Sequence, residues 1–134
     1  MERVCNNAFR LAQALEKLEG VSVNYPLLES SPYHELAEKQ LSGKGGAILT
    51  IRAGSKERAY KLINHLKYVK IATNIGDVRT LVIHPASTIY IHSTPEAMEE
   101  AGVYDDTIRI SVGIEDIKDL IKDFTEAVES LGEE

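Results

Sequence analysis

The sequence predicts an α+β domain of two layers, in which a mixed, mainly antiparallel sheet has helices packed on one of its faces. Short segments of alternating apolar residues are interleaved with longer segments whose apolar residues recur every three or four positions. Each such helix has one apolar stripe, and a sheet with an apolar face gives the stripes a common surface to cover. A chain of 134 residues suffices for one hydrophobic core, so we expect a single domain over residues 1–134.

Ten segments carry this prediction. The helical spacing occurs in five of them, residues 2–19, 31–41, 55–66, 94–102 and 116–131. Strands are predicted for five shorter segments, residues 21–25, 47–52, 69–72, 80–84 and 107–112. The sequence contains no internal repeat, which agrees with one domain.

Polar residues predict where four of the helices begin. Ser31 and Thr94 each precede a proline, the arrangement of an N-cap followed by a first-turn proline. Ser55 and Asp116 are suitable N-caps for the third and fifth helices. Gly20 is a stop signal for the first helix, whose regular apolar stripe we expect to need a partner surface.

On the last helix the apolar side chains are predicted to face inward and the charged side chains outward. The inward set is Ile117, Leu120, Ile121, Phe124, Val128 and Leu131. The outward set is Lys118, Lys122, Asp123, Glu126 and Glu129.

Arg109 is the candidate binding residue, because it lies within a predicted strand. Ile108, Ile110 and Val112 alternate with polar residues, so one face of the strand is predicted to be buried while the other carries a guanidinium. A guanidinium pairs bidentately with a carboxylate or phosphate, and a strand fixes its direction. The pattern leaves open a surface charge or an ordinary ion pair with one of the 21 acidic residues.

Three motifs follow one another along the second half of the chain. They are Asn74-Ile75-Gly76-Asp77, His84-Pro85-Ala86-Ser87-Thr88 and Arg109-Ile110-Ser111-Val112-Gly113-Ile114-Glu115-Asp116. Together they resemble the C-terminal domain of the Cys/Met-metabolism family of pyridoxal-phosphate enzymes, and within it most of all the O-acetylhomoserine sulfhydrylases. The resemblance extends from about residue 2 to residue 128. It implies the small-domain fold of fold-type I pyridoxal-phosphate enzymes, whose open sheet face is turned toward the larger domain and the active site.

The resemblance implies a substrate-binding role for four residues. Arg109 matches the arginine that pairs with the α-carboxylate of the amino-acid substrate, and Asn74 would help to hold the same group. Gly76 would let the backbone approach a ligand closely, and Thr88 lies in a segment near the substrate entrance. Without the resemblance, the pattern of residues 74–77 favours an ordinary turn built by Asn, Gly and Asp. The sequence departs from many relatives at residues 89–90, where Ile-Tyr replaces Thr-His.

The same resemblance implies that a larger domain, with the Schiff-base lysine and the residues that hold pyridoxal phosphate, is absent from this sequence. We therefore expect no catalytic or cofactor-binding residue here and no activity from this chain alone. The expected partners are that larger domain and the carboxylate of an amino-acid substrate. The sequence leaves open whether Met1 is a natural start.

Composition excludes several classes of partner and site. The formal net charge of −6 argues against nucleic acid and anionic membranes, both of which need a basic surface. Cys5, the one cysteine, cannot form an internal disulfide and indicates a reducing compartment, so we expect a cytoplasmic protein. Cys5 is interpreted as a core or interface residue. The four histidines lack a zinc-binding spacing, and no metal is predicted.

Three functions remain in competition. The first is the substrate-carboxylate-binding domain of an O-acetylhomoserine sulfhydrylase, which makes homocysteine or methionine by replacement at the γ-carbon. The second is the same domain of a methionine γ-lyase or a cystathionine-processing enzyme. The third is a non-catalytic module that binds an amino acid or serves assembly. We also expect the isolated chain to self-associate through its first helix and its open sheet face.

Overall fold

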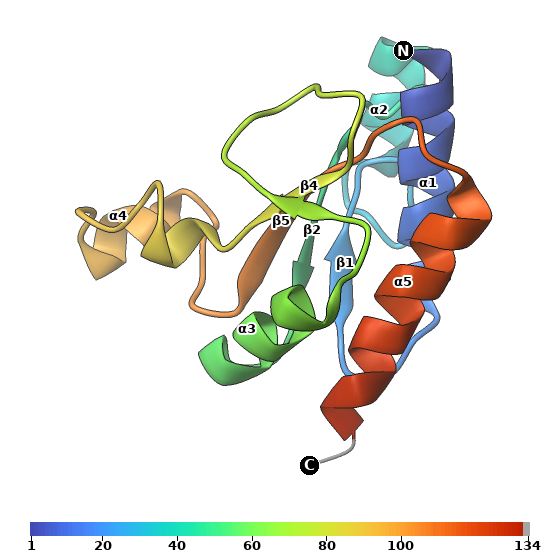
Figure 1. The fold of residues 1–134 in the computed structure, drawn as a ribbon. Coiled ribbons are helices and arrows are strands. Elements are labelled where there is room, and N and C mark those ends of the chain that lie inside the picture. The colour runs from blue at the N-terminus through green and yellow to red at the C-terminus, as the bar shows by residue number, and fades with distance from the viewer. Residues whose placement is uncertain (133–134) are drawn as a thin grey trace.

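The computed structural model describes residues 1–132 and confirms the two-layer α+β architecture. Figure 1 shows a central sheet with helices α1 and α5 side by side along it. In chain order the elements are α1 (Glu2–Glu16), β1 (Ser22–Asn24), α2 (His34–Leu41), β2 (Ile48–Arg52), α3 (Lys56–His65), β3 (Lys70–Ile71), β4 (Leu81–Ile83), the 3-10 helix η1 (Pro85–Ser87), α4 (Pro95–Glu100), β5 (Thr107–Ser111), α5 (Ile117–Glu129) and the 3-10 helix η2 (Ser130–Gly132).

The sheet is mixed and mainly antiparallel, as predicted. Its strand order is β1-β2-β5-β4-β3, so that β5, the last strand of the chain, lies in the centre. The pairs β1–β2, β2–β5 and β4–β5 are antiparallel, and β3 pairs with β4 in parallel. The central position of β5 means that its side chains have neighbours on both sides.

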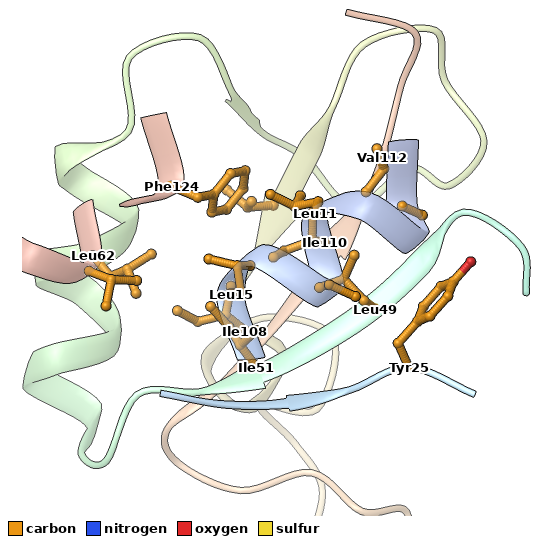
Figure 2. Packing of buried hydrophobic residues seen from close by; sticks show 14 of the residues in the cluster. Leu11, Leu15, Tyr25, Leu49, Ile51, Leu62, Ile108, Ile110, Val112 and Phe124 are labelled. Carbon is orange, nitrogen blue, oxygen red and sulfur yellow. The ribbon is translucent and has the colours of Figure 1, made fainter. Parts of the chain in front are cut away.

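One face of the sheet and the helices α1, α3 and α5 enclose most of the hydrophobic core, to which α2 adds Ala37. Ile110 of β5 lies between Leu49 of β2 and Val82 of β4, and Ile108 lies opposite Ile51. Figure 2 shows Leu49, Ile51, Ile108 and Ile110 of the strands together with side chains from α1, α3 and α5. Burying such a side chain fully contributes roughly 1.5–3 kcal/mol. The core therefore fixes which face of β5 is turned away from the helices.

The apolar stripe of α1 finds its partner within the chain. Leu11 and Leu15 are completely buried, and α1 packs on α5, β1 and β2. The expectation that this helix leaves an apolar surface for another chain is therefore wrong. The stripe is covered because α5 returns alongside α1 after 100 intervening residues of chain.

Three of the four predicted N-caps are confirmed. The side-chain oxygens of Ser55, Thr94 and Asp116 accept hydrogen bonds from the amides at the starts of α3, α4 and α5. The predicted cap at Ser31 is wrong, because its hydroxyl accepts from the Tyr33 amide and α2 begins only at residue 34. α4 lies away from α1 and α5 in Figure 1, and none of its residues is buried.

Asp123 on α5 does not face solvent, as the helical pattern predicted, but is 1% exposed. Its carboxylate accepts hydrogen bonds from the backbone amides of Lys67, at 3.0 and 3.1 Å, and Tyr68, at 3.1 Å. These amides belong to the turn that follows α3. A buried carboxylate persists where charge-assisted hydrogen bonds replace its hydration, so Asp123 joins α5 to the entry of β3.

Candidate functional site

The candidate site is built around Arg109 on the sheet face opposite the helices. Because Ile108 and Ile110 point into the core, Arg109 points to the other face. It lies between Thr50 of β2 and Ile83 of β4 in the strand register. The side chain is half-buried, which combines a fixed direction with access to a ligand.

The charge of Arg109 is not compensated by a carboxylate among the residues that the structure describes. Its Nη2 atom instead donates to the carbonyl oxygen of Thr73 at 2.8 Å. One backbone carbonyl uses one of the five guanidinium hydrogens and leaves the net positive charge in place. The ordinary ion pair that the sequence left open is therefore not what the structure contains.

Arg52 on β2 provides a contrast on the same sheet face. Its Nε donates to the Asp106 carboxylate at 2.9 Å, and its guanidinium lies 4.0 Å from the centre of the Tyr104 ring. Asp106 is buried and also accepts from the amide of Gly54. Arg52 lines a groove of about 280 Å³ beside Thr50, but its charge is already balanced.

The loop of residues 72–80 joins β3 to β4 and brings two further predicted residues to the site. Asn74 follows directly after the carbonyl that Arg109 holds, and its side chain is exposed. The amide of Gly76 donates to the hydroxyl of Ser111 at 3.1 Å, two residues beyond Arg109 on β5. Gly76 has a φ of +84°, a conformation that side chains with a Cβ rarely adopt. Arg109, Asn74 and Gly76 thus gather at one place.

Thr88 lies in a different environment. Its hydroxyl donates to the carbonyl of His84 at 2.8 Å, and it borders a small cavity of about 170 Å³ with Tyr60 and Ile71. Among the described residues, no hydrogen bond links Thr88 to Arg109 or to the loop of residues 72–80. The His84 ring is bound on both nitrogens, by the Ser87 hydroxyl and the Asp105 carbonyl.

The outer face of β5 is more buried than the sequence predicted. Thr107 and Ser111 were expected to share an open face with Arg109, but they are 4% and 1% exposed. Thr107 is covered by the turn before β5, whose Tyr104 amide donates to its hydroxyl at 3.0 Å. At the other end of the strand, the loop of residues 72–80 folds back over Ser111. The amide of Ile114 fixes this loop further by donating to the Val78 carbonyl at 2.9 Å.

A polar cluster at the end of this loop was missed by the sequence analysis. The Glu115 carboxylate accepts from both the amide and the hydroxyl of Thr80, each at 2.8 Å. The buried amide group of Asn7 donates to the carbonyls of Gly113 at 3.1 Å and Glu115 at 2.8 Å. The amide of Gly113 donates to the Thr80 hydroxyl at 3.0 Å. Alternation and spacing carry no signal for such contacts between α1, β4 and the turn after β5.

A Schiff-base lysine is activated by desolvation or by a neighbouring cation, and no lysine in residues 1–132 is buried. The same residues contain no group of three or more His, Cys, Asp or Glu side chains placed to hold a metal ion. No helix in this part of the chain is long and apolar enough to cross a membrane.

Comparison with models of known protein families identifies the family of this chain. Residues 1–129 match the model of the Cys/Met metabolism PLP-dependent enzymes. The chain belongs to this family. Membership places its fold and its three motifs among enzymes that use pyridoxal phosphate, and it confirms the resemblance that the sequence motifs indicated.

Individual members of the Cys/Met metabolism family are similar over nearly the whole chain. The homocysteine synthase of Schizosaccharomyces pombe is 47% identical over 131 residues, which are 96% of this chain and 30% of that protein. An L-methionine gamma-lyase of Fusobacterium nucleatum is 39% identical over 98% of this chain and 33% of that protein. Both reactions are therefore represented among its relatives.

A solved structure supports the fold directly. A protein of Campylobacter jejuni, described as an O-acetylhomoserine (thiol)-lyase with a pyridoxyl-lysine phosphate at position 205, superposes with a TM-score of 0.92 at 35% identity. The match covers 96% of this chain and 31% of that one. The chain thus spans about a third of the length of the relatives it matches.

Proposed function

We propose that this chain is the substrate-carboxylate-binding domain of an O-acetylhomoserine sulfhydrylase, an enzyme that replaces the acetyl group with sulfide or a thiol. The observation that carries the proposal is Arg109, a half-buried arginine without a carboxylate partner among residues 1–132, aimed away from the core by a central strand. Its two cross-strand neighbours, Thr50 and Ile83, are not charged, so an incoming α-carboxylate would be the natural counter-ion.

The role of this chain in such a reaction is orientation. The Arg109 guanidinium would bind the carboxylate through its free N–H groups while Nη2 stays on the Thr73 carbonyl. The exposed Asn74 amide would donate a further hydrogen bond from the adjacent loop. Holding the carboxylate at two points fixes the direction of the α C–H bond, and correct orientation lowers the barrier of the chemical step. Pyridoxal phosphate, held by the larger domain of the complete enzyme, would supply the electron sink.

The second candidate is a methionine γ-lyase or a cystathionine-processing enzyme. The 39% identical L-methionine gamma-lyase of F. nucleatum favours it. The same carboxylate clamp, formed by Arg109 and Asn74, would serve these reactions, because all of their substrates are α-amino acids. The two candidates differ in the leaving group at the γ-carbon, so O-acetylhomoserine with sulfide and methionine alone are the discriminating substrates.

Three further parts of the proposal concern the surroundings of the chain. We infer that the larger domain lies over the sheet face that carries Arg109, where Ile75 and Val78 are exposed at 60% and 63%. Self-association is expected through this apolar surface when the larger domain is absent. The free thiol of the buried Cys5 supports a reducing compartment, the cytoplasm.

The proposal is tested by measuring homocysteine formation from O-acetylhomoserine and sulfide with added pyridoxal phosphate. This chain, a separately prepared lysine-bearing larger domain and the mixture of the two are compared. We expect activity only in the mixture. Arg109→Lys, which keeps the charge but loses the planar fork, is expected to raise KM about 10-fold or more. Arg10→Lys on the exposed surface of α1 is the matched control.

Other results would redirect the assignment. Release of methanethiol from methionine, without homocysteine formation, would favour the γ-lyase. An inactive mixture that contains a folded, cofactor-loaded larger domain would favour a non-catalytic amino-acid-binding module. If the mixture that contains Arg109→Ala has full activity, Arg109 is not required to bind the substrate carboxylate, and the proposed role of this residue is wrong.

A further inference from the structure

We propose that Ser111 is a positioning residue for the Arg109 clamp: its hydroxyl holds the Gly76 amide and thereby fixes the loop of residues 72–80 that presents Asn74 beside the guanidinium. This inference rests on the proposed function. Ser111 has no role in the assignment by motif, in which it is merely a polar residue two positions beyond the arginine.

The first argument is the register of β5. Arg109 and Ser111 are two residues apart and therefore point to the same sheet face. Each contacts the backbone of the same loop at a different point, Arg109 at the Thr73 carbonyl at 2.8 Å and Ser111 at the Gly76 amide at 3.1 Å. Asn74 lies between these two attachment points. The loop backbone is consequently fixed on both sides of the residue that would donate to the substrate.

The second argument is the path of the loop. β3 and β4 run parallel, and only residues 72–80 connect them. Parallel strands are ordinarily joined by longer crossovers that contain a helix, so this short return has no secondary structure of its own. Two hydrogen bonds to the turn after β5 fix the far end of the loop. The Val78 carbonyl accepts from the Ile114 amide, and the Thr80 amide donates to the Glu115 carboxylate. Ser111 provides the attachment in the middle.

The third argument is the burial of Ser111. At 1% exposure its hydroxyl is shielded from water, although Gly76 itself is exposed. A shielded acceptor in a site that excludes competing water gives a hydrogen bond of defined geometry. An alanine at this position has nearly the same shape and lacks only the oxygen. Ser111→Ala therefore removes the attachment without opening a cavity of appreciable size.

The test combines hydrogen exchange on this chain with kinetics of the complete enzyme. For Ser111→Ala we expect the Gly76 amide to exchange about fivefold faster or more, which is the loss expected from one net hydrogen bond. KM for the amino-acid substrate is expected to rise about fivefold while kcat changes by less than about twofold, because the Arg109 guanidinium remains in place to orient the carboxylate once it is bound. Ser111→Thr keeps the hydroxyl oxygen and is expected to restore the exchange rate of the Gly76 amide and KM to their wild-type values.

Ser130→Ala is the matched control, because Ser130 is also buried and hydrogen-bonded, at 2.6 Å to the Ala127 carbonyl. It lies next to the C-terminal end of α5, at the opposite end of the molecule from the loop of residues 72–80 (Figure 1). This variant is expected to leave KM and the exchange of Gly76 unchanged. An equal rise of KM in both serine variants would attribute the effect to general loss of stability and overturn the proposal.

Two other outcomes overturn it in distinguishable ways. Unchanged exchange at Gly76 in Ser111→Ala would show that the hydroxyl does not hold the loop. Faster exchange with unchanged KM, in an enzyme whose KM does rise on Arg109→Lys, would show that the loop does not serve the clamp. If Arg109→Lys leaves KM unchanged, the proposed function itself fails, and the positioning role fails with it.

Discussion

Replacement of Gly113 by alanine is expected to destabilise the domain strongly, because the site for a side chain is already occupied. A Cβ at this position would lie 2.2 Å from the Val78 carbonyl oxygen, 2.6 Å from the Arg79 carbonyl carbon and 2.6 Å from a Glu115 carboxylate oxygen. Van der Waals contacts of carbon atoms are ordinarily near 3.5–4.0 Å. Two of the three atoms belong to the backbone, so rotation of a side chain cannot relieve the overlap.

The cost can be worked out from these contacts. Inserting a methyl group into a packed site costs about 1–3 kcal/mol. Moving the chain apart would also weaken two hydrogen bonds of Gly113, from Asn7 Nδ2 at 3.1 Å and to the Thr80 hydroxyl at 3.0 Å, each worth about 1 kcal/mol. The sum is a loss of about 3–5 kcal/mol. Domains of this kind have a free energy of unfolding of about 5–15 kcal/mol.

Urea denaturation followed by circular dichroism measures this loss. Gly132→Ala is the control, since no atom of residues 1–130 lies within 4 Å of its Cβ position. Neither glycine has a positive φ, so both substitutions are free of left-handed backbone strain and differ in the overlap alone. A loss below about 1 kcal/mol for Gly113→Ala, at an unchanged m-value, would refute the reasoning.

Two further predictions concern buried polar groups. Asp123→Asn is expected to lower the free energy of unfolding by about 2 kcal/mol in urea denaturation, because a neutral amide replaces the anion that accepts from Lys67 and Tyr68. Burial, with a smaller contribution from Cys5, raises the pKa of the Tyr25 hydroxyl well above its ordinary value of 10.0. Tyr25 therefore stays protonated in the folded state while the unfolded chain ionises, so stability should fall as the pH rises above about 10 and should fall less steeply in Tyr25→Phe.

Each of these predictions has a matched control on the surface. Glu129→Gln changes an exposed carboxylate on the same helix as Asp123 and should cost little. A similar loss in both variants would contradict the role assigned to the buried anion. Tyr33→Phe alters a tyrosine that is 65% exposed and should retain the alkaline fall of the wild type. Parallel stability–pH curves for the wild type and Tyr25→Phe would rule out the contribution of Tyr25.

The elements of the fold were predictable wherever the signal is local. The caps Ser55, Thr94 and Asp116 act on amides two or three residues away, and alternation on β5 placed Ile108 and Ile110 in the core. Contacts between distant segments gave no such signal. Asp123 has the helical position of a solvated residue, and only the turn after α3 makes it a buried acceptor.

In the candidate site, too, the features with a local signal were predictable, and those that depend on contacts between distant segments were not. The direction of Arg109 followed from the period of a strand, and its proposed role came from the resemblance of the motifs. The burial of Ser111 did not, because it depends on a loop that begins 39 residues earlier, at residue 72, and folds back over the strand. Thr88 was grouped with Arg109 because both lie in motifs, whereas the structure puts its hydroxyl on the His84 carbonyl.

The geometry of the clamp therefore depends on residues far from the ligand that it would bind. Asn7 of α1 holds the carbonyls on both sides of Ile114, Ile114 holds the Val78 carbonyl, and Val78 belongs to the loop that contains Asn74. A shift of α1 would reach the site through the Asn7 side chain and then through the backbone of the turn and of the loop. Asn7→Leu keeps the branching of the side chain at the γ-carbon but cannot donate, so it should release the turn at residues 113–115. In the complete enzyme, Asn7→Leu should then raise KM for the amino-acid substrate and leave kcat nearly unchanged. The control Asn6→Leu, on the exposed side of α1, should alter neither KM nor kcat.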